Sequence, residues 1–224
     1  MERLLEEIPN FFSYWNIIFL IKAMGVTFLL TLFGCLFGFG FGLTFAIIRK
    51  SETKMMLPFR VIVVFFTEIF RRVPFLVSLL LIFYIFQIFQ ITDSLFIVAL
   101  VSVCLIATAF IGEIIRSGIE SINPEQWDAA RAMNFSYLEI LREIIFPQAW
   151  KEILPPAFAF FILFIKDTAL ASQIGVMELT FAGKVLNNKG FSPVLVFGTI
   201  LILYFILSFP LDRFGKYMEQ KIAS

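Results

Sequence analysis

Histidine is absent from the sequence, and the only cysteines are Cys35 and Cys104, both inside apolar runs. Protein zinc sites draw mainly on Cys and His ligands, so a metal site of that kind is excluded, and we expect no structural disulfide. No nucleophile and base pattern and no phosphate-binding loop of the GxxxxGK[ST] form is present, so no catalytic residue and no resident cofactor are expected.

Charge is also scarce. Only 16% of the residues are charged, the net charge is +1, and 60% are hydrophobic, with a mean hydropathy of +0.92. This balance argues against a nucleic-acid partner and indicates an integral membrane protein in contact with lipid. The first ten residues (MERLLEEIPN) are acidic where a signal peptide is basic, so no cleaved leader is expected.

The apolar segments predict an all-α membrane protein. A spanning helix needs about 20 apolar residues, and this chain offers five such segments in a single transmembrane domain over 1–224. The second contains Pro74 and nearby charges, so we expect an interfacial start and a kink before the crossing. The predicted spans are approximately 14–48, 66–90, 95–118, 153–171 and 193–212.

Lysine and arginine are concentrated in 49–72, 116–151 and 213–221. With five spans these regions fall on one side, which the positive-inside rule assigns to the cytoplasm. The chain is therefore expected to cross the membrane several times with its N-terminus outside and its C-terminus cytoplasmic.

Gly34, Gly38 and Gly42 recur every four residues in the first span, and Thr27 and Thr31 continue the same stripe. Small residues at this spacing let another helix approach closely. The partner helix is either in the same chain or in a second subunit.

A polar segment at 123–147 interrupts the apolar sequence between the third and fourth spans. Asn123, Pro124 and Gln126 predict a capped helix start with a capping box, and Asn134 suits a left-handed helix end. Ser136 and a Glu three residues later predict a second capped helix that ends near Pro147. We expect two helices of about ten residues, with Trp127 as a candidate anchor for a partner.

This segment resembles the cytoplasmic signature of ABC-importer permeases, which reads EAA, three residues, Gly, nine residues and Ile-x-Leu-Pro. The sequence has Asp128-Ala129-Ala130, then Asn134, then Ile144-Ile145-Phe146-Pro147 at the same spacing. It departs from the signature at Asp128, Asn134 and Phe146. Four further segments are similar to those of polar amino-acid permeases: EIFRRVPFL at 68–76, EIIRSGI at 113–119, PQA at 147–149 and KDTAL at 166–170.

The resemblance implies a binding-protein-dependent permease of the histidine/glutamine/arginine type, with the five-helix fold of type I ABC importers, in a bacterial inner membrane. Its implied partners are a cytoplasmic ABC ATPase dimer that holds ATP and Mg²⁺, a second permease subunit, a periplasmic or lipid-tethered binding protein and an amino-acid substrate. The residues implied in coupling to the ATPase are Gln126, Trp127, Asp128, Ala129, Ala130, Arg131 and Asn134.

Several charged side chains lie within the predicted spans. Charges inside a bilayer are costly unless paired or hydrated, so they mark either a substrate path or ion pairs that fix helix register. Lys166 and Asp167 are expected to pair with other residues, for example Glu113 or Arg116, because adjacent residues on a helix point about 100° apart. The candidate path residues are Lys166, Asp167, Thr168, Glu113, Arg116, Glu68 and Arg71.

A different function class stays open at this point. A stand-alone secondary transporter or channel for small zwitterions usually carries an internal repeat. No repeat relates the five predicted spans, and an odd number of spans does not divide into two equal repeats.

Overall fold

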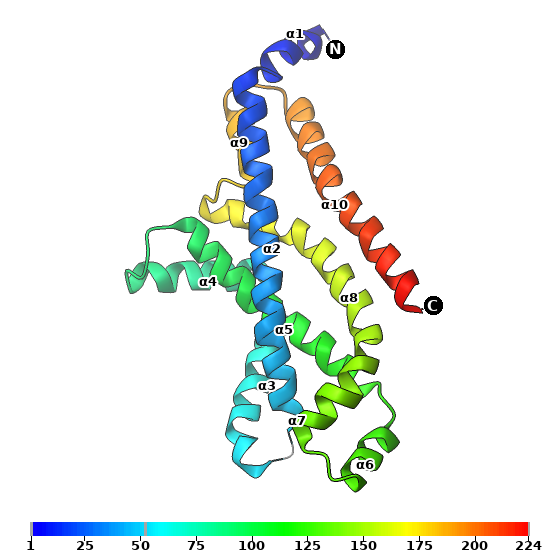
Figure 1. The fold of residues 1–224 in the computed structure, drawn as a ribbon. Helices are drawn as coiled ribbons and strands as arrows, with labels where there is room; N and C mark the ends of the chain where they lie inside the picture. Colours follow the sequence, from blue (N-terminus) through cyan, green and yellow to red (C-terminus); the bar gives the residue numbers. More distant parts are fainter. Residues whose placement is uncertain (1, 52, 224) are drawn as a thin grey trace. The chain divides into compact units, whose positions relative to one another are not determined.

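The computed structural model describes residues 2–51 and 53–223, and all regular structure in this part of the chain is helical (Figure 1). This confirms the all-α prediction. The elements are α1 (Glu2–Phe11), α2 (Tyr14–Lys50), η1 (Lys54–Met56), α3 (Leu57–Arg72), α4 (Phe75–Ile88), α5 (Leu95–Glu120), α6 (Pro124–Ala132), α7 (Tyr137–Glu139), η2 (Ile140–Ile145), α8 (Phe146–Asp167), η3 (Thr168–Ile174), α9 (Leu179–Asn188) and α10 (Pro193–Ala223).

Four helical stretches in the described residues are long and apolar enough to cross a membrane, and the broken pair α3 and α4 can supply a fifth crossing. The expected interruption at Pro74 is present, because Val73 and Pro74 separate the two helices. The stretch that corresponds to the fourth predicted span is one helical run over Tyr137–Ile174, and it begins well before the predicted boundary at residue 153.

The chain divides into two compact units. Unit 1 contains residues 1–34, 75–103 and 162–211, and unit 2 contains residues 35–74, 104–161 and 212–224. The long helices α2, α5, α8 and α10 each contribute one part to unit 1 and another part to unit 2.

Unit 1 is built around an apolar core that joins the first part of α2 to α9 and α10. Buried side chains of Leu20, Leu179, Leu186 and Val196 belong to this cluster. The hydroxyl of Thr27 accepts a hydrogen bond from the Leu179 backbone N–H at 3.1 Å, which satisfies a donor in the first turn of α9. The two segments are thus joined by both apolar contact and a buried polar contact.

Unit 2 is held together by close approach between the second part of α2 and α5. A Cβ added at Gly42 would lie 2.7 Å from the Gly112 nitrogen, and one at Gly38 would lie 2.6 Å from the Ala107 Cβ. In unit 1, Gly34 is similarly close to Val103. The glycine stripe therefore packs within one chain, which resolves the alternative left open by the sequence.

Candidate functional site

The polar segment begins with helix α6, whose first turn is capped by Asn123. The Asn123 side-chain oxygen accepts a hydrogen bond from the Glu125 backbone N–H at 2.9 Å, and Pro124 follows the cap as predicted. The expected reciprocal bond from Gln126 is absent from the described contacts. The predicted capping box at this end is therefore wrong, because the cap uses a donor one position earlier.

Helix α6 ends in the predicted left-handed turn. Asn134 has φ +64°, and its N–H donates to the Arg131 carbonyl at 2.9 Å. The Phe135 N–H donates to the Ala130 carbonyl at 3.2 Å. These two bonds form a Schellman motif, which satisfies carbonyl groups that the helix end leaves open. Asn replaces the signature glycine without losing the turn, since Asn tolerates this conformation better than most side chains.

The second helix starts at Ser136 with the predicted capping box. The Ser136 N–H donates to the Glu139 carboxylate at 2.8 Å, and the Glu139 N–H donates back to the Ser136 hydroxyl at 3.5 Å. The predicted end near Pro147 is wrong, because the chain continues through the π-helical segment η2 directly into α8. The ring of Pro147 would clash with the preceding turn of a regular α-helix, and the wider π turn leaves room for it.

One face of α6 is buried and the other is open. Trp127 is 7% exposed and Ala130 is 1% exposed, so both face the protein itself. The interpretation of Trp127 as an anchor for a partner is corrected by this burial. The remaining predicted coupling residues are exposed: Gln126, Asp128, Ala129, Arg131 and Asn134.

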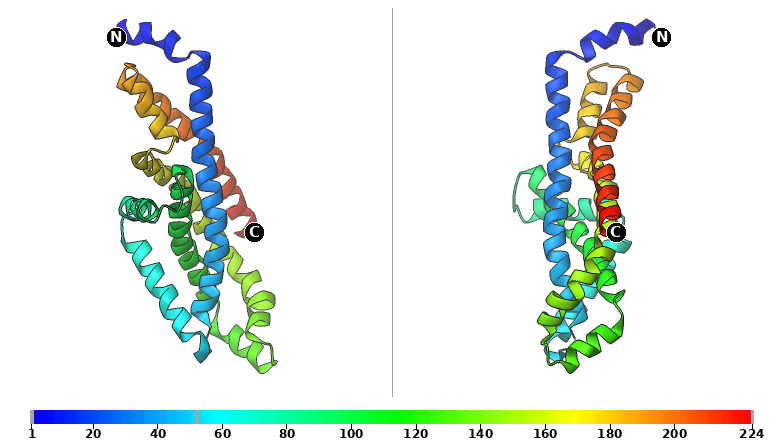
Figure 2. Two further views of the ribbon diagram at one scale, coloured as in Figure 1. Left: turned by 90° about the vertical axis from the view of Figure 1, so that its left-hand side faces the viewer. Right: turned by 45° about the vertical axis from the view of Figure 1, so that its right-hand side comes forward.

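The buried face of α6 is fixed to the end of α2. The Trp127 ring stacks on Tyr137, with ring centroids 6.3 Å apart, and the Lys50 ammonium lies 5.7 Å from the Trp127 ring. The Tyr137 hydroxyl donates to the Ile47 carbonyl at 3.1 Å. Figures 1 and 2 show α6 and the following turn at the same end of unit 2 as the C-terminal end of α2. The segment is therefore docked, which a helix this short requires.

A second feature of unit 2 is an ionic cluster centred on Glu113. Its Oε2 accepts from Arg49 at 2.7 Å, and its Oε1 accepts from Arg116 at 2.6 Å. Arg71 is an ion-pair partner at 3.5 Å. Arg116 also pairs with Glu120, which lies 4.0 Å from the Lys50 ammonium. One carboxylate thus joins arginines from α2, α3 and α5.

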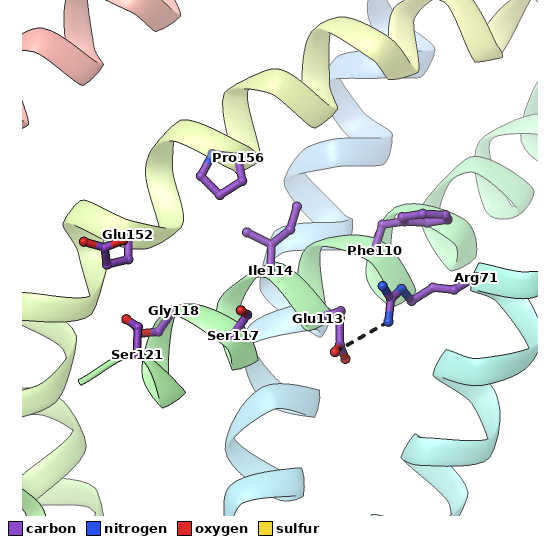
Figure 3. A pocket seen from close by; sticks show the side chains of 9 residues that line it. All are labelled: Arg71, Phe110, Glu113, Ile114, Ser117, Gly118, Ser121, Glu152 and Pro156. Atoms are coloured by element: carbon purple, nitrogen blue, oxygen red, sulfur yellow. Dashed lines mark hydrogen bonds and ion pairs between the residues drawn. The ribbon is translucent and has the colours of Figure 1, made fainter. Parts of the chain in front are cut away.

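This cluster borders a pocket with a volume of about 370 Å³ (Figure 3). Arg71 and Glu113 line one end, Glu152 on α8 lines the other, and the hydroxyls of Ser117 and Ser121 lie between them. The predicted path residue Glu68 instead pairs with the exposed Arg72 at 2.5 Å.

The other predicted path residues lie in unit 1, where α8 changes into the 3₁₀ segment η3. Lys166 and Asp167 are exposed, and Thr168 is buried with its hydroxyl donating to the Ile165 carbonyl at 2.7 Å. Glu113 and Arg116 pair within their own cluster in unit 2, and the suggested pairing of Lys166 or Asp167 with either of them stays a prediction. Lys166 lines a pocket of about 420 Å³ with Tyr204 and Ser208.

Sequence reasoning missed a polar cluster around Glu178 in unit 1. This buried carboxylate caps α9 by accepting from the Thr180 and Phe181 backbone N–H groups at 3.0 and 2.7 Å, and it accepts from the Tyr204 hydroxyl at 2.8 Å. Burial raises the pKa of Glu178, while the hydrogen bonds from Thr180, Phe181 and Tyr204 act against that rise. A Glu at a helix start was the only signal in the sequence.

The fold and the docked polar segment define a permease subunit of a transport system. The profile described as binding-protein-dependent transport system inner membrane component matches residues 38–224. The chain belongs to this family.

Named relatives extend this result. The L-cystine transport system permease protein TcyB of Bacillus subtilis (strain 168) is 32% identical over 211 residues, covering 94% of this chain and 88% of the relative. The arginine transport system permease protein ArtQ of the same organism is 26% identical over 210 residues, covering 92% and 93%. A putative glutamine transport system permease protein GlnP of Rickettsia felis is 27% identical over 210 residues, covering 93% and 95%.

Solved structures agree with the fold. One described as an amino acid ABC transporter with histidines superimposes with a TM-score of 0.84 at 26% identity, covering 97% of this chain and 98% of the other. A chain of the inward-facing MetNI methionine ABC transporter has a TM-score of 0.82 at 21% identity, covering 94% and 99%. The second likeness supports the fold alone.

Proposed function

We propose that this chain is the membrane subunit through which an ATP-driven importer passes a polar amino acid across a bacterial inner membrane. The observation that carries the proposal is the docked segment 123–147. It presents an exposed face of Asp128, Ala129 and Arg131 while its other face is fixed to its own subunit. The relatives named above for cystine, arginine and glutamine support an amino-acid cargo.

In this proposal the exposed face of α6 is the contact with a cytoplasmic ABC ATPase dimer, which binds ATP and Mg²⁺ and carries out hydrolysis. The subunit itself is non-catalytic. A second permease subunit, either a copy or a relative, completes the path, and a periplasmic or lipid-tethered binding protein delivers the substrate. The N-terminus lies outside and the C-terminus in the cytoplasm, because the basic segments then face inward.

Reconstitution in proteoliposomes tests the proposal. The chain is combined with the ATPase, permease and binding protein encoded beside it, and uptake of L-cystine, L-glutamine and L-arginine is measured with ATP on the ATPase side. ATP-dependent uptake of at least one of them is expected. Uptake by this chain without an ATPase would instead support the stand-alone transporter, which the family membership disfavours.

A further inference from the structure

Residues 49–60 join α2 to α3 and carry four basic side chains but only one acidic side chain. Arg49 and Lys50 are already used within unit 2, where each lies beside a carboxylate of the ionic cluster described above. Lys54 is exposed and Arg60 is half-buried, and neither has an ion-pair partner in the part of the chain that the structure describes. These two cations are therefore available to an anion from outside the chain.

The charge of Arg60 is directed toward the beginning of α3. Its Nη1 donates a hydrogen bond to the Ser51 carbonyl at 3.4 Å, so the guanidinium reaches back past the first turn of the helix. Lys54 is in η1, directly before α3 (Figure 1). A guanidinium has five N–H donors, and this hydrogen bond occupies only one of them. Both cations thus lie at the same end of the η1 and α3 segment, and both can donate to an acceptor there.

The exposed apolar residues of this segment form a stripe that begins at the same end. Met55, Ile62 and Phe65 are 81%, 65% and 67% exposed, and their spacing is that of one helix face. Ile69 continues the stripe, whereas Val63 is buried against the protein. A stripe of this kind on a membrane protein is suited to contact with acyl chains, and it runs from the end that carries the cations.

We propose that the start of α3 binds anionic phospholipid, with the headgroup at Lys54 and Arg60 and an acyl chain along the apolar stripe. Basic residues beside a membrane surface attract anionic lipid, and neighbouring apolar residues add burial among the acyl chains. A headgroup of net negative charge gains from both cations, whereas a zwitterionic headgroup also brings an ammonium group that they repel. The stripe favours lipid over a soluble partner, because it continues along the helix. The inference does not depend on the proposed transport function.

A tryptophan reporter on the stripe tests this assignment. Phe65→Trp is introduced into the full chain, which is reconstituted in vesicles of phosphatidylcholine with a fixed minor fraction of phosphatidylglycerol. Bromine, which quenches tryptophan at short range, is placed on the acyl chains of the phosphatidylglycerol or of an equal mole fraction of the phosphatidylcholine. The parent chain without the added tryptophan supplies the background. We expect brominated phosphatidylglycerol to quench several-fold more strongly, with a smaller preference at high salt.

Matched variants assign the preference to the two cations. Lys54→Gln combined with Arg60→Gln should make quenching by the two brominated lipids equal. Arg72→Gln is the control, because it removes a cation from the opposite end of α3, where the side chain pairs with Glu68, and it should keep the preference. Vesicles of brominated phosphatidylcholine alone should quench all variants to the same extent, which shows that the reporter still faces lipid in each.

Equal quenching by the two brominated lipids in the Phe65→Trp protein overturns the proposal. A preference that survives in the double variant also overturns it, because the two cations would then have no part in the selection. If neither lipid quenches the reporter, the stripe is covered by protein, such as a second copy of this chain, and the assignment to lipid is wrong.

Discussion

The Tyr137 hydroxyl donates a hydrogen bond to the Ile47 carbonyl at 3.1 Å, across 90 positions in the sequence. This bond joins the first turn after the Asn134 bend to the last turn of α2. Together with the Trp127 and Tyr137 stack, it determines how the exposed face of α6 is presented.

Replacing Tyr137 by Phe removes this hydrogen bond and keeps the stacked ring. Such a bond contributes about 1 kcal/mol, so we expect a slightly lower Tm of the solubilised protein and a lower ratio of uptake to ATP hydrolysis in the reconstituted complex. Tyr217→Phe is the control, since that side chain is 58% exposed. Equal uptake ratios in the two variants would show that the bond has no part in coupling.

The left-handed turn at Asn134 gives a second prediction. A β-branched residue is strained at φ +64°, so Asn134→Val should cost about 1–3 kcal/mol locally and reduce ATP-driven uptake. Asn134→Gly restores the residue of the family signature and should keep full uptake. If Val and Gly transport equally well, the turn is not needed for coupling.

Close packing of α2 on α5 can be tested by replacing two glycines of α2, one at a time, with alanine. Gly42→Ala places a Cβ 2.7 Å from the Gly112 nitrogen, and we expect a loss of about 1–3 kcal/mol and a clearly lower Tm. At Gly40 nothing lies within 4 Å of an added Cβ, so Gly40→Ala should leave the Tm unchanged or slightly raised. A reversed order of the two Tm values would contradict the observed register of α2 on α5.

Neutralising Glu113, the centre of the ionic cluster, should lower the stability of the protein more than neutralising an exposed carboxylate. Glu113→Gln leaves Arg49, Arg71 and Arg116 without their shared anion, and we expect a loss of about 1–3 kcal/mol after allowance for partial exposure. Glu68→Gln removes a pair with Arg72 and should cost less than about 1 kcal/mol. Thermal melting of both variants measures the difference, and similar Tm values would refute the central role of Glu113.

Much of this architecture follows from the sequence because it is encoded locally. The break at Pro74, the Asn134 turn and the Ser136 box each depend on a few neighbouring residues. The spacing of the family signature, visible in this one sequence, adds the prediction that the segment 123–147 couples to an ATPase.

The parts that the sequence did not predict depend on contacts between distant segments. Nothing near Trp127 shows that Tyr137 and Lys50 will cover its ring. Likewise, Glu113 pairs with Arg49, 64 positions away, and with Arg71 on α3, and neither pairing is visible in the neighbouring sequence. The π segment η2 was missed because a proline in sequence reads as a helix end, while a wide turn in three dimensions lets the helix continue.

The central claim is that the exposed face of α6 contacts the ATPase, and site-directed cross-linking at two adjacent alanines tests it most directly. Ala129 is exposed and Ala130 is 1% exposed. The two single Ala→Cys variants therefore carry the same thiol, one on the exposed face of α6 and one on its buried face. Each variant, with the native cysteines replaced, is coupled to a thiol-linked photocross-linker in the assembled complex. We predict a covalent adduct with the ATPase from Ala129→Cys and little or none from Ala130→Cys. The account is contradicted if Ala129→Cys gives no adduct in a complex that hydrolyses ATP and imports substrate.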